Sequence, residues 1–183
     1  TVSNNKSFFF FFYSAFPVCE KLVGPRAALS PADLNGTWAF IAGSLNHPSS
    51  MEALKQRDSI TAFFSNNNET STWSYTQVNR FGDQCEHMPY NITLEGSRFT
   101  FDVGNRFSLS GSFLYTTCPD CLVMQWVVES RKRRSMDLYL LSRRRILTQS
   151  ELIEFKAQLR CFQLPAPIEM DSFKELCPKE PEN

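Results

Sequence analysis

Short segments in which apolar and polar residues alternate follow one another from residue 34 to residue 142, and this pattern constrains the fold most. In the clearest segment, Trp73 and Tyr75 face one side of an extended chain and Ser74 and Thr76 face the other. Gly, Asn, Asp and Ser separate the segments, which indicates an antiparallel sandwich or barrel. About eight strands would close a barrel wide enough for one small ligand. The predicted strands cover residues 38–43, 59–64, 72–79, 90–94, 98–103, 106–116, 122–129 and 137–141.

One main helix is predicted after the strands. Thr148 and Glu151 have the spacing of a capping box, in which side chains satisfy early backbone donors reciprocally. Leu152, Phe155 and Leu159 then fall on one helical face, which we expect to pack on the outside of the barrel. Two prolines soon after prevent a regular continuation.

Six cysteines, spread from Cys19 to Cys177, indicate a disulfide framework formed in an oxidising compartment. Four glycosylation sequons point the same way. Asn68, in a polar run, is the best glycan candidate, whereas Asn35 lies close to a predicted strand start. We therefore expect a secreted, extracellular glycoprotein with acceptor positions at Asn5, Asn35, Asn68 and Asn91.

Residues 1–16 are predicted to be a signal-peptide remnant or a retained N-terminal arm. Lys6 precedes the apolar residues 8–16, which have the character of the end of a signal peptide and are too short to span a bilayer as a helix. After cleavage, Ala15 would be the last residue removed. Residues 17–177 are predicted to form one domain, and residues 178–183 a flexible tail.

The 19 basic and 19 acidic residues cancel, which argues against a nucleic acid partner, and no stable membrane insertion is expected. Two basic clusters nevertheless stand out, at residues 131–134 and 143–145. One interpretation is a solvated hairpin loop and a strand end. Another is a patch for an anionic surface, such as a heparin-like glycan or lipid headgroups, and the first cluster also has the composition of a proteolytic processing site.

No catalytic or metal-binding constellation is evident. His47 and His87, the only histidines, are expected in loops without an orienting partner. The segment Cys118-Pro119-Asp120-Cys121 fits a redox motif, half a zinc site or a structural disulfide. A redox pair favours a helix N-terminus and a zinc site needs further ligands, so we favour the structural disulfide and predict no catalytic residue, metal or cofactor.

Asn35-Gly36-Thr37-Trp38 resembles the Gly-x-Trp signature that opens the first strand of lipocalins. Further segments resemble the lipocalin group of alpha-1-acid glycoprotein and apolipoprotein M, and the similarity extends to fish plasma lipocalins, including tributyltin- and toxin-binding types. The resemblance spans residues 17–177 and implies an eight-stranded up-and-down barrel with one C-terminal helix outside. The matching segments are residues 17–23, 36–42, 83–85, 116–119, 150–155, 159–161 and 173–177.

The resemblance also implies disulfide pairings. Cys19 would pair with Cys161, and Cys85 with Cys177. In apolipoprotein M the partner of the cysteine matching Cys118 would lie near residue 149 or 150, where this chain has none. We therefore expect Cys118 to pair with Cys121.

For the ligand site, the resemblance places a pocket-lining aromatic at Phe40 and gives Trp38 a packing role at the barrel floor. Arg106 falls where apolipoprotein M has an arginine that meets its ligand's phosphate, so an acidic headgroup is expected there. Other acid-binding positions of that protein do not match. The inward-facing aromatics expected to line the pocket with Phe40 are Trp73, Tyr75, Phe99, Phe101, Trp126 and Tyr139.

The expected function is that of a monomeric extracellular carrier of a small hydrophobic or amphipathic molecule, such as a lipid, a steroid or a drug- or toxin-like compound. The alternative is a secreted acute-phase or immunomodulatory protein that acts through its basic patch and glycans and associates with lipoproteins or cell-surface glycans. An isomerase-like lipocalin enzyme would need a free cysteine at the barrel mouth.

Overall fold

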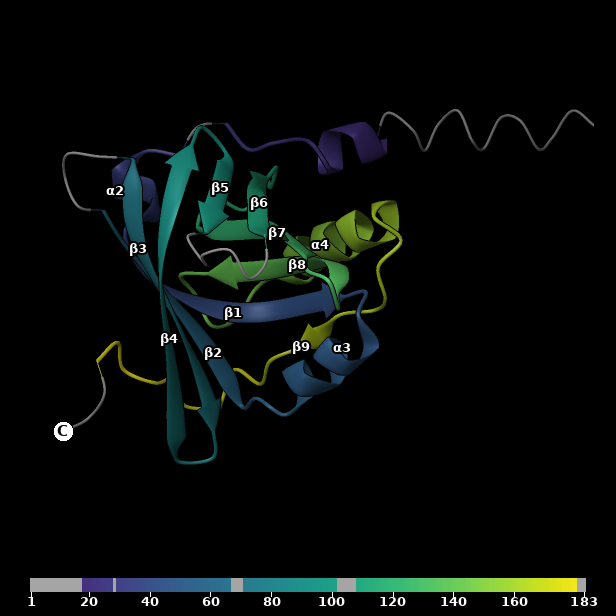
Figure 1. Cartoon of the computed structure of the whole chain (residues 1–183). Helices are drawn as coiled ribbons and strands as arrows, with labels where there is room; N and C mark the ends of the chain where they lie inside the picture. The colour runs from purple at the N-terminus through teal and green to yellow at the C-terminus, as the bar shows by residue number, and fades with distance from the viewer. Residues whose placement is uncertain (1–17, 28, 67–70, 102–107, 181–183) are drawn as a thin grey trace, which may run out of the picture.

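A computed structural model describes residues 18–27, 29–66, 71–101 and 108–180 (Figure 1). Eight strands each pair antiparallel with the next, and β1 pairs with both β2 and β8. This ring of pairings confirms the predicted closed up-and-down barrel. Its strands are β1 (Gly36–Leu45), β2 (Ser59–Asn66), β3 (Thr72–Phe81), β4 (Gln84–Glu95), β5 (Arg98–Phe101), β6 (Ser108–Leu114), β7 (Cys121–Glu129) and β8 (Arg134–Ser142).

Residues 84–89, which lie between two of the predicted strands, belong to β4, and β4 forms with β3 a hairpin that turns at Gly82, where φ is 61°. His87 therefore lies in β4 and not in a loop. Pro89 discourages a strand prediction because it cannot donate a ladder hydrogen bond. Among the described residues, β4 pairs with β5 only over Ile92–Glu95. On the side of β4 that faces away from β3, Pro89 therefore has no strand partner among the described residues and needs no ladder N–H.

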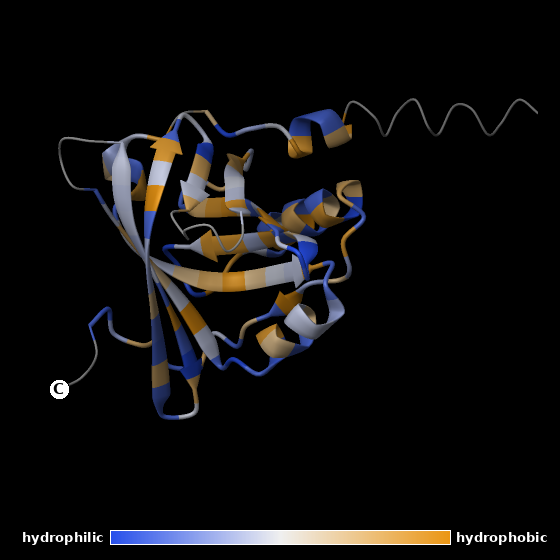
Figure 2. Cartoon of the chain, viewed as in Figure 1, coloured by the Kyte–Doolittle hydropathy of each residue, from blue (hydrophilic) through white to orange (hydrophobic). Residues whose placement is uncertain are grey.

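The predicted helix is α4 (Gln149–Cys161), and it packs outside the barrel (Figures 1 and 2). The Thr148 backbone N–H donates to the Glu151 carboxylate over 2.7 Å, and the Glu151 N–H donates to the Thr148 hydroxyl, which completes the capping box. Phe155 and Leu159 are buried against outward-facing residues of the strands. That cluster includes Ala39, Ile41, Val123, Leu138 and Leu140.

Between residues 30 and 56, two shorter helices that were not predicted flank β1. The first, α2 (Pro31–Leu34), begins with a capping box between Ser30 and Asp33. The second, α3 (Pro48–Lys55), connects β1 to β2. Among the described residues, no helix combines the length and apolar character needed to cross a lipid bilayer.

The C-terminal segment is attached along the outside of the barrel. Its short strand β9 (Ile168–Glu169) pairs with β1. The Ser44 hydroxyl donates to the carbonyl of Pro165 over 2.7 Å, and the Ser59 hydroxyl donates to the carbonyl of Glu175 over 2.6 Å. These long-range bonds hold the segment to the two strands that flank α3.

Candidate ligand site at the barrel mouth

One end of the barrel, which we call the floor, is closed. Trp38 lies there, 2% exposed, and its Nε1 donates to the carbonyl of Leu34 over 2.9 Å. The Arg143 guanidinium lies 3.7 Å from the centre of the indole ring and donates to three backbone carbonyls within residues 33–37. A cation over an indole face stabilises both groups, so these contacts are those of a packing pair.

Aromatic rings fill the barrel above the floor. The ring centre of Phe99, a residue only 1% exposed, lies 5.1 Å from that of Phe113 and 5.4 Å from that of Trp126. The ring centre of Phe101 lies 4.7 Å from that of Trp126. A Cβ at Gly111 would collide with the Phe99 ring and a neighbouring carbonyl, so the missing side chain lets that ring lie against the strand. The interior is packed at this level.

The opposite end, which we call the mouth, holds a cavity of about 360 Å³, near the lower limit for small-molecule sites. Three hollows of 380–480 Å³ elsewhere on the chain have no Phe, Tyr or Trp in their walls, so the mouth cavity is the better site for an apolar ligand. Its walls are Arg57, Tyr75, Gln77, Met88, Tyr90, Leu109, Trp126, Val128, Ser130, Arg133, Asp137 and Tyr139.

The structure divides the predicted pocket aromatics into two groups. Tyr75, Trp126 and Tyr139 lie in the cavity wall. Trp73, Phe99 and Phe101 are buried in the packed interior and do not border the cavity. Phe40 does not border it either: it is buried in a separate cluster with Leu45, Leu54 and Ile60, and its ring centre lies 5.1 Å from that of Tyr139. Arg106 lies outside the described residues.

The sequence reasoning missed the polar members of the wall. Gln77 and Asp137 each stand two residues from a predicted aromatic, in the same strand phase, so the alternation that selected the aromatics also pointed to them. Arg57 gave no such signal, because it precedes β2 in the connection from α3.

A chain of hydrogen bonds runs along one wall of the mouth. The Tyr75 hydroxyl donates to Gln77 Oε1 over 3.0 Å, and Gln77 Nε2 donates to Asn79 Oδ1 over 2.9 Å. Asn79 Nδ2 then donates to Glu86 over 3.2 Å. The chain fixes the orientation of the amides, so this wall presents preorganised polar atoms.

Asp137 forms the charged part of the opposite wall. Its carboxylate lies 3.4 Å from Arg133 Nη2 and accepts a hydrogen bond from the Tyr139 hydroxyl over 3.3 Å. Burial raises the pKa of Asp137 and outweighs the opposing effect of Arg133. Burial likewise raises the pKa of the Tyr139 hydroxyl.

Two donors on side chains of the mouth wall have no hydrogen-bond partner among the described residues. They are Arg57 Nε and Trp126 Nε1, both buried. Among the ion pairs of the described residues, none involves Arg57. A buried donor without a partner costs about 1–3 kcal/mol, so each of these groups calls for a partner.

All six cysteines are paired, as Cys19–Cys161, Cys85–Cys177 and Cys118–Cys121. The first two pairs coincide with those that the resemblance implies, and the third with the expected local pair. Asp120 lies beside the sulfur atoms of Cys118 and Cys121, but those two atoms are bonded to each other and do not act as thiolate ligands to a metal.

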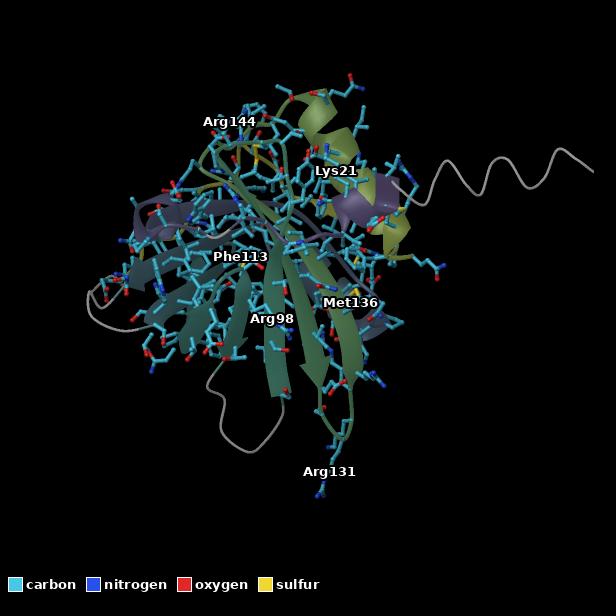
Figure 3. The ribbon with its side chains drawn as sticks, turned by 90° about the horizontal axis from the view of Figure 1, so that it is seen from above. Lys21, Arg98, Phe113, Arg131, Met136 and Arg144 are labelled. Carbon is cyan, nitrogen blue, oxygen red and sulfur yellow. A yellow bond between two sulfur atoms is a disulfide. The ribbon has the colours of Figure 1, made fainter. Side chains whose placement is uncertain are left out.

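The two basic clusters lie at opposite ends of β8, as the separation of Arg131 and Arg144 shows (Figure 3). The second cluster is engaged within the protein. Arg144 pairs with Asp120 over 2.6 Å and with Glu151 over 2.8 Å, and Arg145 donates to two backbone carbonyls. The clusters therefore do not form one patch.

Two of the four sequons fall on described residues. Asn91 is exposed on β4. Asn35 is also exposed, but its side-chain oxygen accepts a hydrogen bond from the backbone of Asn66 over 3.0 Å. Asn5 and Asn68, like Ala15, lie outside the described residues.

Neither a family model nor a curated protein matches the chain. Solved structures do. Lipocalin 12 from rat epididymis is 16% identical, with a TM-score of 0.72 over 84% of this chain and 91% of that one. The siderocalin Ex-FABP, described as functioning through dual ligand specificities, is 14% identical, with a TM-score of 0.65 over 80% of this chain and 99% of that one. The fold is thus that of lipocalins.

Proposed function

We propose that this protein is an extracellular carrier that binds a small hydrophobic or amphipathic molecule at the mouth of its barrel. The mouth cavity, with Tyr75, Trp126 and Tyr139 in its walls, carries the proposal. Apolar walls remove ligand surface from water at about 25 cal/mol per Å², and the fixed polar atoms orient the ligand. Because the aromatic interior and three disulfides hold the barrel, binding needs little further ordering.

Secretion is supported by the pairing of all six cysteines, since disulfides persist in oxidising compartments. Exposed Asn91 supports glycosylation. The two long-range disulfides support a place in the alpha-1-acid glycoprotein and apolipoprotein M group, which also contains the fish types. We propose that the carrier acts as a monomer without a cofactor, and that it binds ligand and catalyses no reaction.

The alternative, an interaction protein that uses a basic patch, has less support. The second basic cluster is occupied by intramolecular contacts at the floor. Of the first cluster, Arg131, Lys132 and Arg134 are exposed, and Arg134 pairs with Glu129 over 3.4 Å. Association with lipoproteins or cell-surface glycans would then rest on residues 129–134, which join β7 to β8 at the mouth and which we call the mouth hairpin, and its affinity would fall with salt.

Quenching of tryptophan fluorescence tests the carrier function. Fatty acids, lysophospholipids, steroids and organotins are titrated against the protein, and saturable quenching at micromolar ligand or below, with little salt dependence, is expected. Most of the quenching should disappear in Trp126→Phe and persist in the matched control Trp73→Phe, whose residue does not border the cavity. Absence of saturable quenching across the panel, or full quenching in Trp126→Phe, would contradict the proposal.

A further inference from the structure

Two side chains in the wall of the mouth cavity each carry a buried N–H donor that has no hydrogen-bond partner among the described residues. One donor is Nε1 of Trp126, a residue that is 6% exposed. The other is Nε of Arg57. Indole and guanidinium N–H groups donate only, so each requires an acceptor atom. Two such side chains in one cavity wall favour a ligand that carries acceptor atoms.

Among the described residues that line the mouth cavity, one positive charge has no ion-pair partner. Of the cavity residues, Arg57, Arg133 and Asp137 carry charge, and Arg133 is paired with Asp137. Arg57 lies in the wall of the same cavity as Tyr75 and Tyr139, and its charge opposes the rise that burial causes in the pKa of both tyrosines. An anion at Arg57 would balance the site.

The shape of the cavity limits the rest of the ligand. Its inner wall is Trp126, which rests on the buried rings of Phe99 and Phe101. The described interior below holds packed aromatic rings, which favour a compact ligand over a long chain. The side walls, formed by Tyr75, Tyr139 and neighbouring aliphatic side chains, suit a compact body with flat faces.

We propose, building on the carrier function, that the ligand is a compact ring-containing organic anion. Its acidic head accepts hydrogen bonds at Arg57, and a further acceptor atom meets Trp126 Nε1. The ring body lies between the two tyrosines. Long single-chain lipids are poor ligands by this reasoning.

Two fluorescent probes with nearly the same ring body separate the head from the body. Anilinonaphthalene sulfonate carries an anionic group, and N-phenylnaphthylamine is neutral. We expect the wild type to bind the sulfonate more tightly. In Arg57→Gln the sulfonate affinity should fall about 10- to 100-fold, the loss expected for a charge-assisted hydrogen bond, while binding of the neutral probe stays within about twofold.

Three further variants complete the experiment. Arg131→Gln removes an exposed charge from the mouth hairpin outside the cavity wall, and should leave both affinities unchanged. Arg57→Lys keeps the charge without the planar donor fork, and should retain part of the sulfonate affinity. Trp126→Phe keeps a ring without the N–H, and should weaken the sulfonate more than the neutral probe. Circular dichroism identifies variants that fail to fold.

The outcomes distinguish this inference from the carrier function. Saturable binding of both probes with equal affinity, unchanged by Arg57→Gln, overturns the anion site and leaves the carrier function standing. Equal losses in Arg57→Gln and Arg131→Gln also overturn it, because the effect would then be long-range attraction. If neither probe binds the wild type saturably, the carrier function itself fails.

Discussion

Replacement of Phe99 by alanine tests whether the barrel interior is packed. The side chain is 1% exposed, and its ring lies 5.1–5.8 Å from the rings of Phe101, Phe113 and Trp126. Buried Phe-to-Ala changes cost about 3–5 kcal/mol, depending on how far the site collapses. Gly111, against which the ring lies, has no side chain to move into the space. We therefore expect about 4 kcal/mol.

Urea unfolding with intact disulfides, followed by circular dichroism, measures this loss in the free energy of unfolding. The dependence on urea should keep its slope, because the surface exposed on unfolding is nearly unchanged. Phe173→Ala is the matched control: that ring is 92% exposed, so its loss should change stability by at most about 0.5 kcal/mol.

The same variant should change ligand choice. Removal of the Phe99 ring opens space behind Trp126, so a long-chain fatty acid should gain affinity relative to a short one. Buried Phe-to-Ala changes typically cost about 3 kcal/mol or more. A loss below about 1 kcal/mol in the free energy of unfolding would therefore refute the inference that rings fill the barrel.

Three other changes have defined outcomes. Thr148→Ala removes a cap of α4 and should lower the free energy of unfolding by about 1 kcal/mol in urea titrations; no change would deny the cap a role. Gly111→Ala should cost about 1–3 kcal/mol by the same assay, because its Cβ would meet the Gln125 carbonyl and the Phe99 ring; a stabilised variant would contradict that close approach. Burial raises the pKa of Asp137 in the folded state, so the folded chain holds this proton more tightly than the unfolded chain does. The free energy of unfolding therefore falls as pH rises from the pKa of Asp137 in the unfolded chain, about 4, through its raised pKa in the folded chain. Asp137→Asn removes this fall, so the melting temperature of the variant relative to the wild type should rise with pH. A relative rise on acidification instead would contradict a raised pKa of Asp137.

The sequence pattern by itself determined an antiparallel array of short strands followed by one helix, and the family resemblance selected the barrel over the sandwich. Alternation with a period of two and a capping box are local patterns, and each acts over a few residues of neighbouring chain. Hence Trp73 and Tyr75 were assigned correctly to one face of β3, and Thr148 to the start of α4. The pairing of Cys118 with Cys121 is local as well, whereas the long-range pairs came from the family resemblance.

Only the tertiary structure decided where along the barrel each inward side chain lies. Strand phase tells inside from outside, but height between floor and mouth depends on the register of strands far apart in sequence. For this reason Phe99 and Tyr139 looked equivalent, yet one is packed in the interior and the other lines the cavity. Arg57 reaches that cavity from a connection, and β8 sets Arg131 and Arg144 at opposite ends; neither placement has a local signature.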